Sequence, residues 1–77
     1  MPPVRDVAIA DDTIRLGQLM KLANLADSGG DAKAVLAAGE VRVNGEVETR
    51  RGRQLRRGDE VVAMGQHVRV VGKPRMA

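Results

Sequence analysis

The sequence predicts a single α+β domain in which two packed N-terminal helices are followed by a small antiparallel sheet of three to four short strands. Three observations support this prediction. The chain has 77 residues, enough for one domain with a thin core. Apolar residues recur with a period of 3.6 before Gly39 and with a period of 2 after it. Glycine-containing polar clusters separate the apolar segments, as expected for turns.

Residues 1–13 are predicted to form an N-terminal arm. Pro2 and Pro3 disfavour regular structure, and residues 7–10 either form a short edge strand or stay irregular. The segment Asp11-Asp12-Thr13 is typical of a helix start, because such side chains complement the positive end of the helix dipole.

The first helix is predicted over residues 14–25. Its apolar residues are spaced i, i+3, i+4 and i+7, whereas Arg15, Gln18 and Lys21 fall outside the apolar stripe. Asp27-Ser28-Gly29-Gly30-Asp31 then interrupts the chain, and Ser28 is the predicted cap of a second helix.

The second helix is predicted over residues 29–38, with Gly39 as a left-handed C-terminal cap. A helix of about ten residues is too short to be stable alone, so it has to pack against the first one. Gly29-Gly30 is either a purely structural turn or a place where free N–H groups at the helix start contact a phosphate.

A strand over residues 41–43 and a turn at Asn44-Gly45 predict a β-hairpin. A two-residue turn would pair Val43 with Glu46 and place Val47 on the exposed face. A three-residue loop with a bulge at Gly45 would pair Val43 with Val47 and keep both inside, so this register is the predicted one.

The remaining third of the chain predicts a basic connection and two further strands. Residues 49–57 form the connection, with Leu55 as its only apolar anchor, and Gly58-Asp59 is a turn. Strands are predicted over residues 61–64 and 68–71 with a turn at Gly65-Gln66 between them. The predicted domain therefore covers residues 14–71, and residues 72–77 form a C-terminal tail.

The composition excludes several classes of protein. The chain has no Cys, one His and no aromatic residue, which excludes a disulfide scaffold, a thiolate zinc site and RNA recognition by ring stacking. No segment has the length of a membrane span or the apolar run of a signal peptide. We therefore expect a cytoplasmic protein of bacterial type that does not contact membranes.

Catalysis is not expected. His67 has no nucleophile nearby in sequence and is predicted to be a surface or packed strand residue. The carboxylate pairs Asp11-Asp12 and Glu46/Glu48 lie in a chain too short to enclose a pocket for acid–base chemistry. The prediction is a protein with no catalytic residues, metal site, cofactor or small-molecule substrate.

Positive charge is concentrated in the second half of the chain. The net charge is +3 overall, but residues 42–57 alone hold six Arg and two Glu. Planar guanidinium groups suit bidentate phosphate contacts better than Lys does. The alternative is a solvated loop whose Arg residues only confer solubility.

A longer pattern links these features. Ala32-Lys33 is followed by Gly39-Glu40-Val41-Arg42-Val43-Asn44-Gly45 and, after the basic loop, by Gly58-Asp59 and an apolar strand. This pattern resembles the S-four-like RNA-binding domain, named for ribosomal small-subunit protein four, over residues 14–71. Leu16-Gly17-Gln18, Ser28-Gly29-Gly30 and Glu48-Thr49-Arg50-Arg51-Gly52 look like the short stand-alone bacterial members.

The resemblance implies an alpha-L motif in which the helix pair and the adjacent loop form a positive groove for structured RNA. Two residues depart from the family pattern: Gly17 stands where many members have Asp, and Gly29 where many have Arg. Without that Arg, RNA binding is weaker or relies more on the loop over residues 50–53. The predicted RNA-binding residues are Arg15, Lys21, Lys33, Arg42, Arg50, Arg51, Arg53, Arg56 and Arg57.

The predicted partner is structured RNA, either ribosomal or tRNA-like, with ribosomal proteins as possible further partners. Ribosomal RNA or a ribosome-assembly intermediate is the preferred target. Two alternatives stay open: a protein–protein adaptor that docks on a ribosomal protein or an RNA-modifying enzyme, and an accessory chain of such an enzyme. A DNA reader is disfavoured because no helix has a cluster of Arg, Asn or Gln suited to the major groove.

Overall fold

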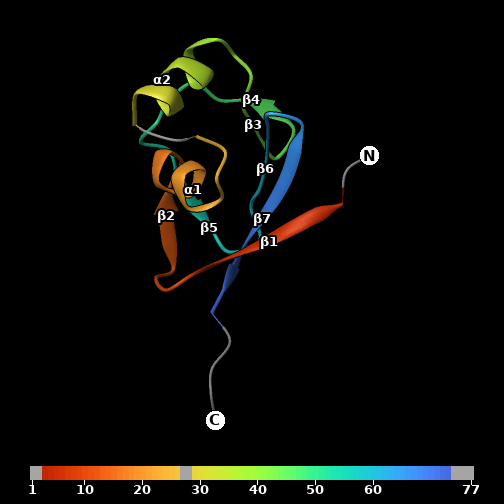
Figure 1. The fold of residues 1–77 in the computed structure, drawn as a ribbon. Coiled ribbons are helices and arrows are strands. Elements are labelled where there is room, and N and C mark those ends of the chain that lie inside the picture. Colours follow the sequence, from red (N-terminus) through yellow and green to blue (C-terminus); the bar gives the residue numbers. More distant parts are fainter. Residues whose placement is uncertain (1–2, 27–28, 74–77) are drawn as a thin grey trace.

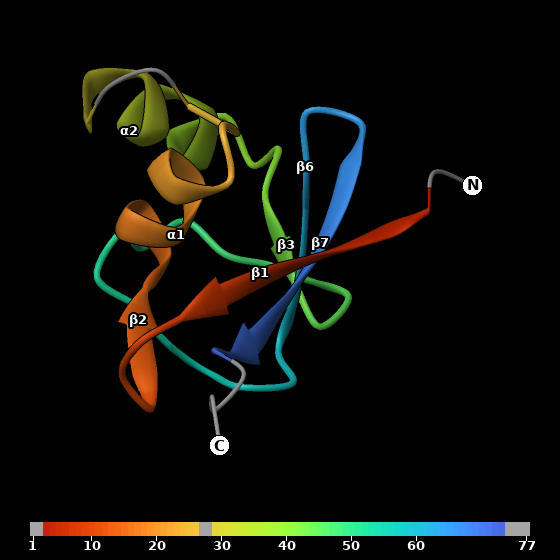
Figure 2. The ribbon, with the colours of Figure 1, turned by 60° about the horizontal axis from the view of Figure 1, so that its bottom comes forward.

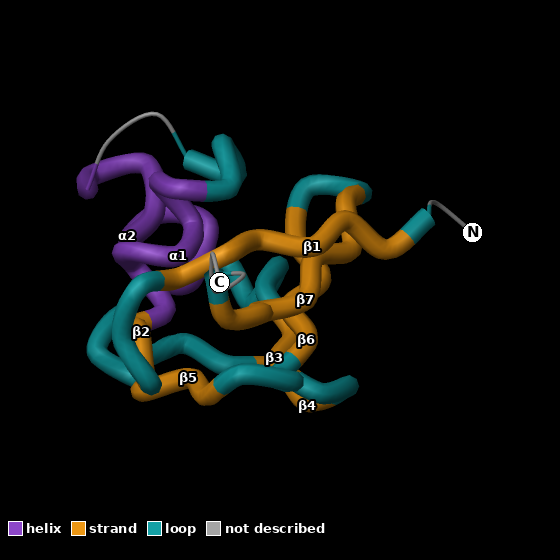
Figure 3. Tube along the Cα trace, turned by 90° about the horizontal axis from the view of Figure 1, so that it is seen from below, coloured by secondary structure: helices purple, strands orange, loops and turns teal. Residues whose placement is uncertain are grey.

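Two short helices pack on one side of a five-stranded sheet, and a two-stranded sheet lies beside the first helix (Figures 1 and 3). The structure is a computed structural model, and it describes residues 3–26 and 29–73. The five-stranded sheet has the order β1-β7-β6-β3-β4, and the two-stranded sheet pairs β2 with β5. In chain order the elements are β1 (Val4–Ile9), β2 (Thr13–Arg15), α1 (Leu16–Leu22), α2 (Gly29–Ala37), β3 (Arg42–Val43), β4 (Glu46–Val47), β5 (Gln54–Arg56), β6 (Glu60–Ala63) and β7 (Gln66–Gly72).

The α+β class and the two packed helices agree with the sequence prediction, but the chain begins with strands rather than with a helix. β1 pairs in parallel with β7, from Val4 opposite His67 to Ile9 opposite Gly72 (Figure 2). The prediction of a purely antiparallel sheet of three to four strands was therefore wrong. Val7 and Ile9 are buried against the core, which stabilises β1 on the edge of β7. This pairing joins the two ends of the described chain, so no local pattern indicates it.

The first helix begins two residues later than predicted. Thr13–Arg15 pairs antiparallel with Gln54–Arg56 and forms β2 instead of the first helical turn. Ile14 lies opposite Leu55, which is fully buried. The strand pairing with a distant segment overrides the helix-start signal of the preceding acidic residues, and it fixes the position at which α1 starts.

The helix ends follow the local sequence more closely. α1 ends at Leu22, three residues before the predicted end at Leu25. The chain leaves the helix because Asn24 has a left-handed φ of 59°, and the N–H of Leu25 donates to the carbonyl of Met20 at 2.7 Å. α2 spans Gly29–Ala37 nearly as predicted, and Gly39 takes the predicted left-handed conformation with a φ of 73°. The predicted cap Ser28 lies outside the described residues, as do residues 74–77 of the predicted tail.

The hairpin register was predicted incorrectly. Asn44 and Gly45 both have positive φ, at 51° and 86°, so they form a two-residue turn that pairs Val43 with Glu46. Val47 is 52% exposed as a result. The turn conformation prevailed over the burial of one valine, and the next residue, Glu48, takes the inner position opposite Val41.

The core lies between the helices and the inner face of the five-stranded sheet. α1 contributes Leu16, Leu19 and Met20, which are fully buried. The strands contribute alternate residues, and their other residues form an open outer face. The core residues from the rest of the chain are Val7, Ile9, Ala23, Leu25, Ala32, Leu36, Val41, Val43, Leu55, Val61, Ala63, Val68 and Val70.

Candidate nucleic-acid interface

The basic loop over residues 50–53 is fixed to the start of α1 by main-chain hydrogen bonds. The N–H of Leu16 donates to the carbonyl of Arg53 at 2.8 Å, and the N–H of Gly17 donates to the carbonyl of Arg51 at 3.0 Å. The residue before the helix, Arg15, makes no capping bond with its side chain. The loop carbonyls therefore take the place of a side-chain cap, and the loop is held at a defined position on the helix.

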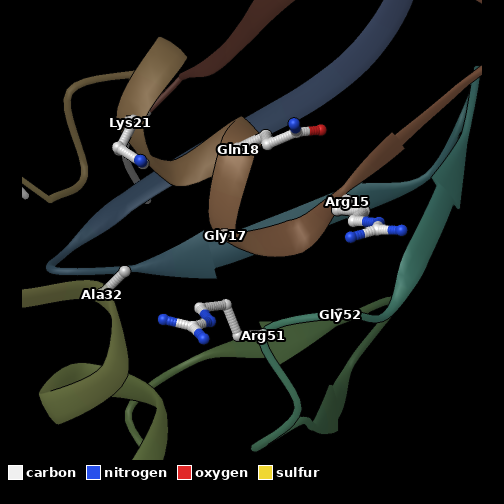
Figure 4. Close-up of a pocket in the computed structure, with 7 residues that line it drawn as sticks. All are labelled: Arg15, Gly17, Gln18, Lys21, Ala32, Arg51 and Gly52. Carbon is white, nitrogen blue, oxygen red and sulfur yellow. The ribbon is translucent and has the colours of Figure 1, made fainter. Parts of the chain in front are cut away.

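Gly17 lies directly against the Arg51 side chain. A Cβ atom placed on Gly17 would be 2.5 Å from Cγ of Arg51 and 3.2 Å from its Cδ. Gly17 is buried beneath this arginine, and in Figure 4 the Arg51 side chain lies beside the Gly17 turn with its guanidinium group directed toward Ala32. The close contact is possible only because residue 17 has no side chain.

An open pocket of about 400 Å³ lies between α1, the start of α2 and the loop. Three cationic side chains line it: Arg15 and Lys21, which flank the first turns of α1, and Arg51 from the loop. Among residues 3–26 and 29–73, no carboxylate forms an ion pair with any of the three. The pocket is lined by Arg15, Gly17, Gln18, Lys21, Ala32, Arg51 and Gly52.

A second hollow continues this surface along the loop. It is lined by Arg50, Gly52, Arg53 and Gln54, and it shares Gly52 with the first pocket. We call the two hollows together the cationic surface. Two segments that lie about thirty residues apart in sequence thus bring five of the predicted cations to one continuous region: Arg15, Lys21, Arg50, Arg51 and Arg53.

Glu48 is an acidic residue that contacts two arginines of this surface. It is 8% exposed, and it accepts a hydrogen bond from Nε of Arg50 at 3.0 Å. Nη1 of Arg53 lies 3.9 Å from its other carboxylate oxygen. The Glu48 carboxylate therefore offsets part of the positive charge of these two arginines, whereas Arg51 between them has no ion pair among the described residues.

The other predicted cations lie outside the two hollows. Lys33 follows Ala32 on α2 and is exposed. Arg42 projects from the outer face of the five-stranded sheet between Val47 and Val62. Arg56 is exposed on β5.

Arg57 has contacts of its own. Its guanidinium group lies 3.7 Å from the carboxylate of Asp12 and against Gly72, so it links the β5–β6 turn to the segment before β2. The role of these four cations in binding stays a prediction.

Sequence reasoning missed two residues that shape the surface. Gly17 and Glu48 were noted in motifs that resemble the short stand-alone members, Gly17 also as a departure from the family pattern and Glu48 as half of a carboxylate pair without a pocket, but neither was predicted to shape a binding surface. The burial of Glu48 could have been predicted from a two-residue turn at Asn44-Gly45, because the register that this turn imposes places Glu48 opposite the buried Val41. No local signal indicates that Gly17 contacts Arg51.

Other chemical groups of the structure offer little at this surface. His67 lies on β7, where its Nε2 is 2.6 Å from a carboxylate oxygen of Glu60. Within the described ranges, no three His, Asp or Glu side chains converge as a metal site would require. Neither helix described in the structure has the length and apolar character needed to cross a membrane.

Comparison with known proteins adds an independent line of observation. The model of the S4 domain family matches residues 7–71. A protein of Bacillus subtilis (strain 168) named "Probable ribosome maturation protein RlbA" is 48% identical over 59 residues, which cover 77% of this chain and 83% of that protein. "Putative RNA-binding protein YbcJ" of Escherichia coli (strain K12) is 40% identical over 58 residues, covering 75% of this chain and 83% of that protein.

Proposed function

The chain belongs to the S4 domain family, and from this membership we propose that it binds structured RNA of the ribosome, either ribosomal RNA or an assembly intermediate, without catalysing a reaction. The names of the two relatives, which refer to ribosome maturation and to RNA binding, support this target. The predicted cytoplasmic location and the predicted domain boundaries stay predictions.

The observation that carries the proposal is the convergence of Arg15, Lys21 and Arg51 on one pocket without an acidic partner in the described structure. Like charges repel one another, so a cluster of this kind is not explained by folding stability. A polyanion whose phosphates lie within the pocket would neutralise all three cations. Arg50 and Arg53 extend the same charge along the second hollow.

The chemistry of the surface favours recognition of shape and backbone over recognition of base sequence. The chain has no aromatic side chain on which bases would stack. Folded or A-form RNA is read mainly through its phosphates and 2′-hydroxyl groups, and Gln18 supplies an amide in the pocket that both donates and accepts hydrogen bonds. With about five to seven phosphates neutralised, the log–log dependence of affinity on salt should have a slope on the order of −4 to −6.

The test is a competition titration. A labelled, folded fragment of ribosomal RNA is bound by the full chain in moderate salt, and unlabelled folded RNA, duplex DNA of equal charge and unstructured single-stranded RNA then compete for the protein. We expect only the folded RNA to compete efficiently. Equal competition by all three nucleic acids would show that the surface binds polyanions without regard to their shape. Absence of RNA binding would favour the alternative function of a protein–protein adaptor.

A pair of variants assigns the binding to the surface. R15Q/R51Q removes two cations of the pocket. R69Q/K73Q removes two exposed cations, one on β7 and one just after it, that lie outside the pocket and are not among the predicted RNA-binding residues, so the two proteins have the same net charge. We expect R15Q/R51Q to weaken binding of the folded RNA much more than R69Q/K73Q does. Equal losses would contradict the assignment to the pocket and would implicate overall charge instead.

A further inference from the structure

The contact between Gly17 and Arg51 does more than fill space. Arg51 lies on the loop, and its carbonyl accepts a hydrogen bond from the N–H of Gly17 at 3.0 Å. The backbone of Arg51 is thereby fixed relative to α1. From this fixed backbone, Cγ of Arg51 extends to a point 2.5 Å from where a Cβ of residue 17 would be.

The position of Cγ depends only on the backbone and on χ1. Side chains occupy staggered rotamers, so Cγ has three preferred places once the backbone is fixed. The observed rotamer uses the place that is free only when residue 17 is glycine, because real Cβ atoms essentially never approach another carbon to 2.5 Å. Any side chain at position 17 therefore excludes this rotamer of Arg51, or separates the loop from the helix.

We propose that Gly17 is a positioning residue for RNA binding: by lacking a side chain, it leaves room for the Arg51 rotamer that places the guanidinium group in the pocket beside Ala32. This inference rests on the proposed function, because it concerns how the same surface presents one of its cations. According to this proposal, Gly17 does not touch the RNA and acts only through Arg51.

The backbone at position 17 does not itself require glycine. Gly17 lies in α1 and does not have a positive φ, and alanine is intrinsically favoured over glycine within a helix. Apart from the two side-chain carbons, the nearest atom to the added Cβ is the carbonyl oxygen of Arg51 at 3.5 Å, an ordinary contact. The added Cβ of Gly17→Ala would thus clash with the Arg51 side chain and not with the backbone, and this allows a sharp test.

The test is a double-variant cycle with four proteins: the natural chain, G17A, R51A and G17A/R51A. Each phosphate contact contributes about 0.7–0.9 to the slope of log affinity against log salt, which corresponds to a five- to eightfold change in affinity at about 0.1 M salt. We expect G17A to lose about this factor for the folded RNA and to flatten the slope by nearly one. In the R51A background, where no Cγ is present, the same substitution should change affinity less than twofold.

A second background serves as the matched control. In R15A the Arg51 side chain is intact, so Gly17→Ala should again lose about five- to eightfold. A thermal midpoint of G17A equal to or above that of the natural chain would show that the loss is not unfolding. Unchanged affinity of G17A, or equal losses in the R51A and R15A backgrounds, would overturn the inference.

A measurement without RNA separates this inference from the proposed function. In the free protein, a nuclear Overhauser effect is expected between the Hα protons of Gly17 and the Hγ protons of Arg51, and in G17A the Arg51 side-chain signals should shift as the rotamer changes. If these signals behave as expected but no RNA binds, the proposed function fails and the contact stands. If the contact is absent from the spectrum although RNA binds at the pocket, the inference fails and the proposed function stands.

Discussion

Replacing Glu48 with Gln tests the organisation of the basic loop. Glu48 is the buried acceptor for Arg50 and a neighbour of Arg53, and Gln has nearly the same shape without the charge. The substitution therefore removes a charge-assisted hydrogen bond and leaves the packing intact. The E48Q protein should be less stable, and it should bind polyanions with a steeper salt dependence because Arg50 and Arg53 become available for phosphates.

The size of the effect follows from how exposed the two cations are. The Arg50 side chain is 77% exposed and that of Arg53 is 33% exposed, so both regain water when the carboxylate is lost. The large penalty for leaving an unpaired charge buried does not apply. A net loss of about 1–2 kcal/mol in the free energy of unfolding remains, which corresponds to a fall of about 4–16 °C in the midpoint of a domain of this size.

Urea titration followed by far-ultraviolet circular dichroism measures this change, since the chain has no aromatic fluorophore. Glu46→Gln is the matched control: Glu46 lies on β4 two residues before Glu48, is exposed, and has no ion pair among the described residues, yet the substitution changes the net charge equally. The control should shift stability by less than about 0.5 kcal/mol. Equal stability of E48Q and E46Q would refute the view that a buried carboxylate organises the loop.

Two further predictions concern the loop and the first strand. Changing Arg50, Arg51 and Arg53 together to Gln should weaken binding of folded RNA and flatten the salt slope by about two to three while circular dichroism shows the fold retained; affinity that stays the same at matched salt would contradict the role of the loop. Val7→Ala should lower the free energy of unfolding by about 2 kcal/mol, because Val7 is buried on β1. Val4→Ala on the same strand removes a side chain that is 42% exposed and should change stability by less than about 0.5 kcal/mol, so similar losses in urea titrations of the two variants would contradict the register of β1 on β7.

Several features were predictable because their causes are local. The left-handed conformation of Gly39 and the turn at Gly58-Asp59, where Gly58 has a φ of 96°, depend on residues within a few positions of each other. The strand at residues 60–63 lies one residue earlier than predicted, and the turn after it is formed by Met64 and Gly65 rather than by Gly65-Gln66, because Ala63 pairs with Gln66. The concentration of arginine in residues 50–57 is visible directly in the sequence.

Local signals failed where a distant segment competed for the same residues. The acidic residues before Thr13 predict a helix start, but pairing of β2 with β5 across about forty residues holds Thr13–Arg15 extended. The register that would bury Val47 was also not adopted. Asn44 and Gly45 both have the positive φ values of a two-residue turn, and this turn pairs Val43 with Glu46 and leaves Val47 exposed.

The sequence by itself determined the α+β class, the two helices, most of the turns and the positive charge of the loop, since each depends on residue type and on short-range spacing. Only the tertiary structure decided that β1 closes the sheet against β7, that Glu48 is buried, and that Arg51 lies against Gly17 in a pocket that Arg15 and Lys21 also line. These features arise from contacts between segments far apart in the chain. Such contacts depend on how the elements pack in space, and the spacing of residues along the sequence does not encode that packing in any local pattern.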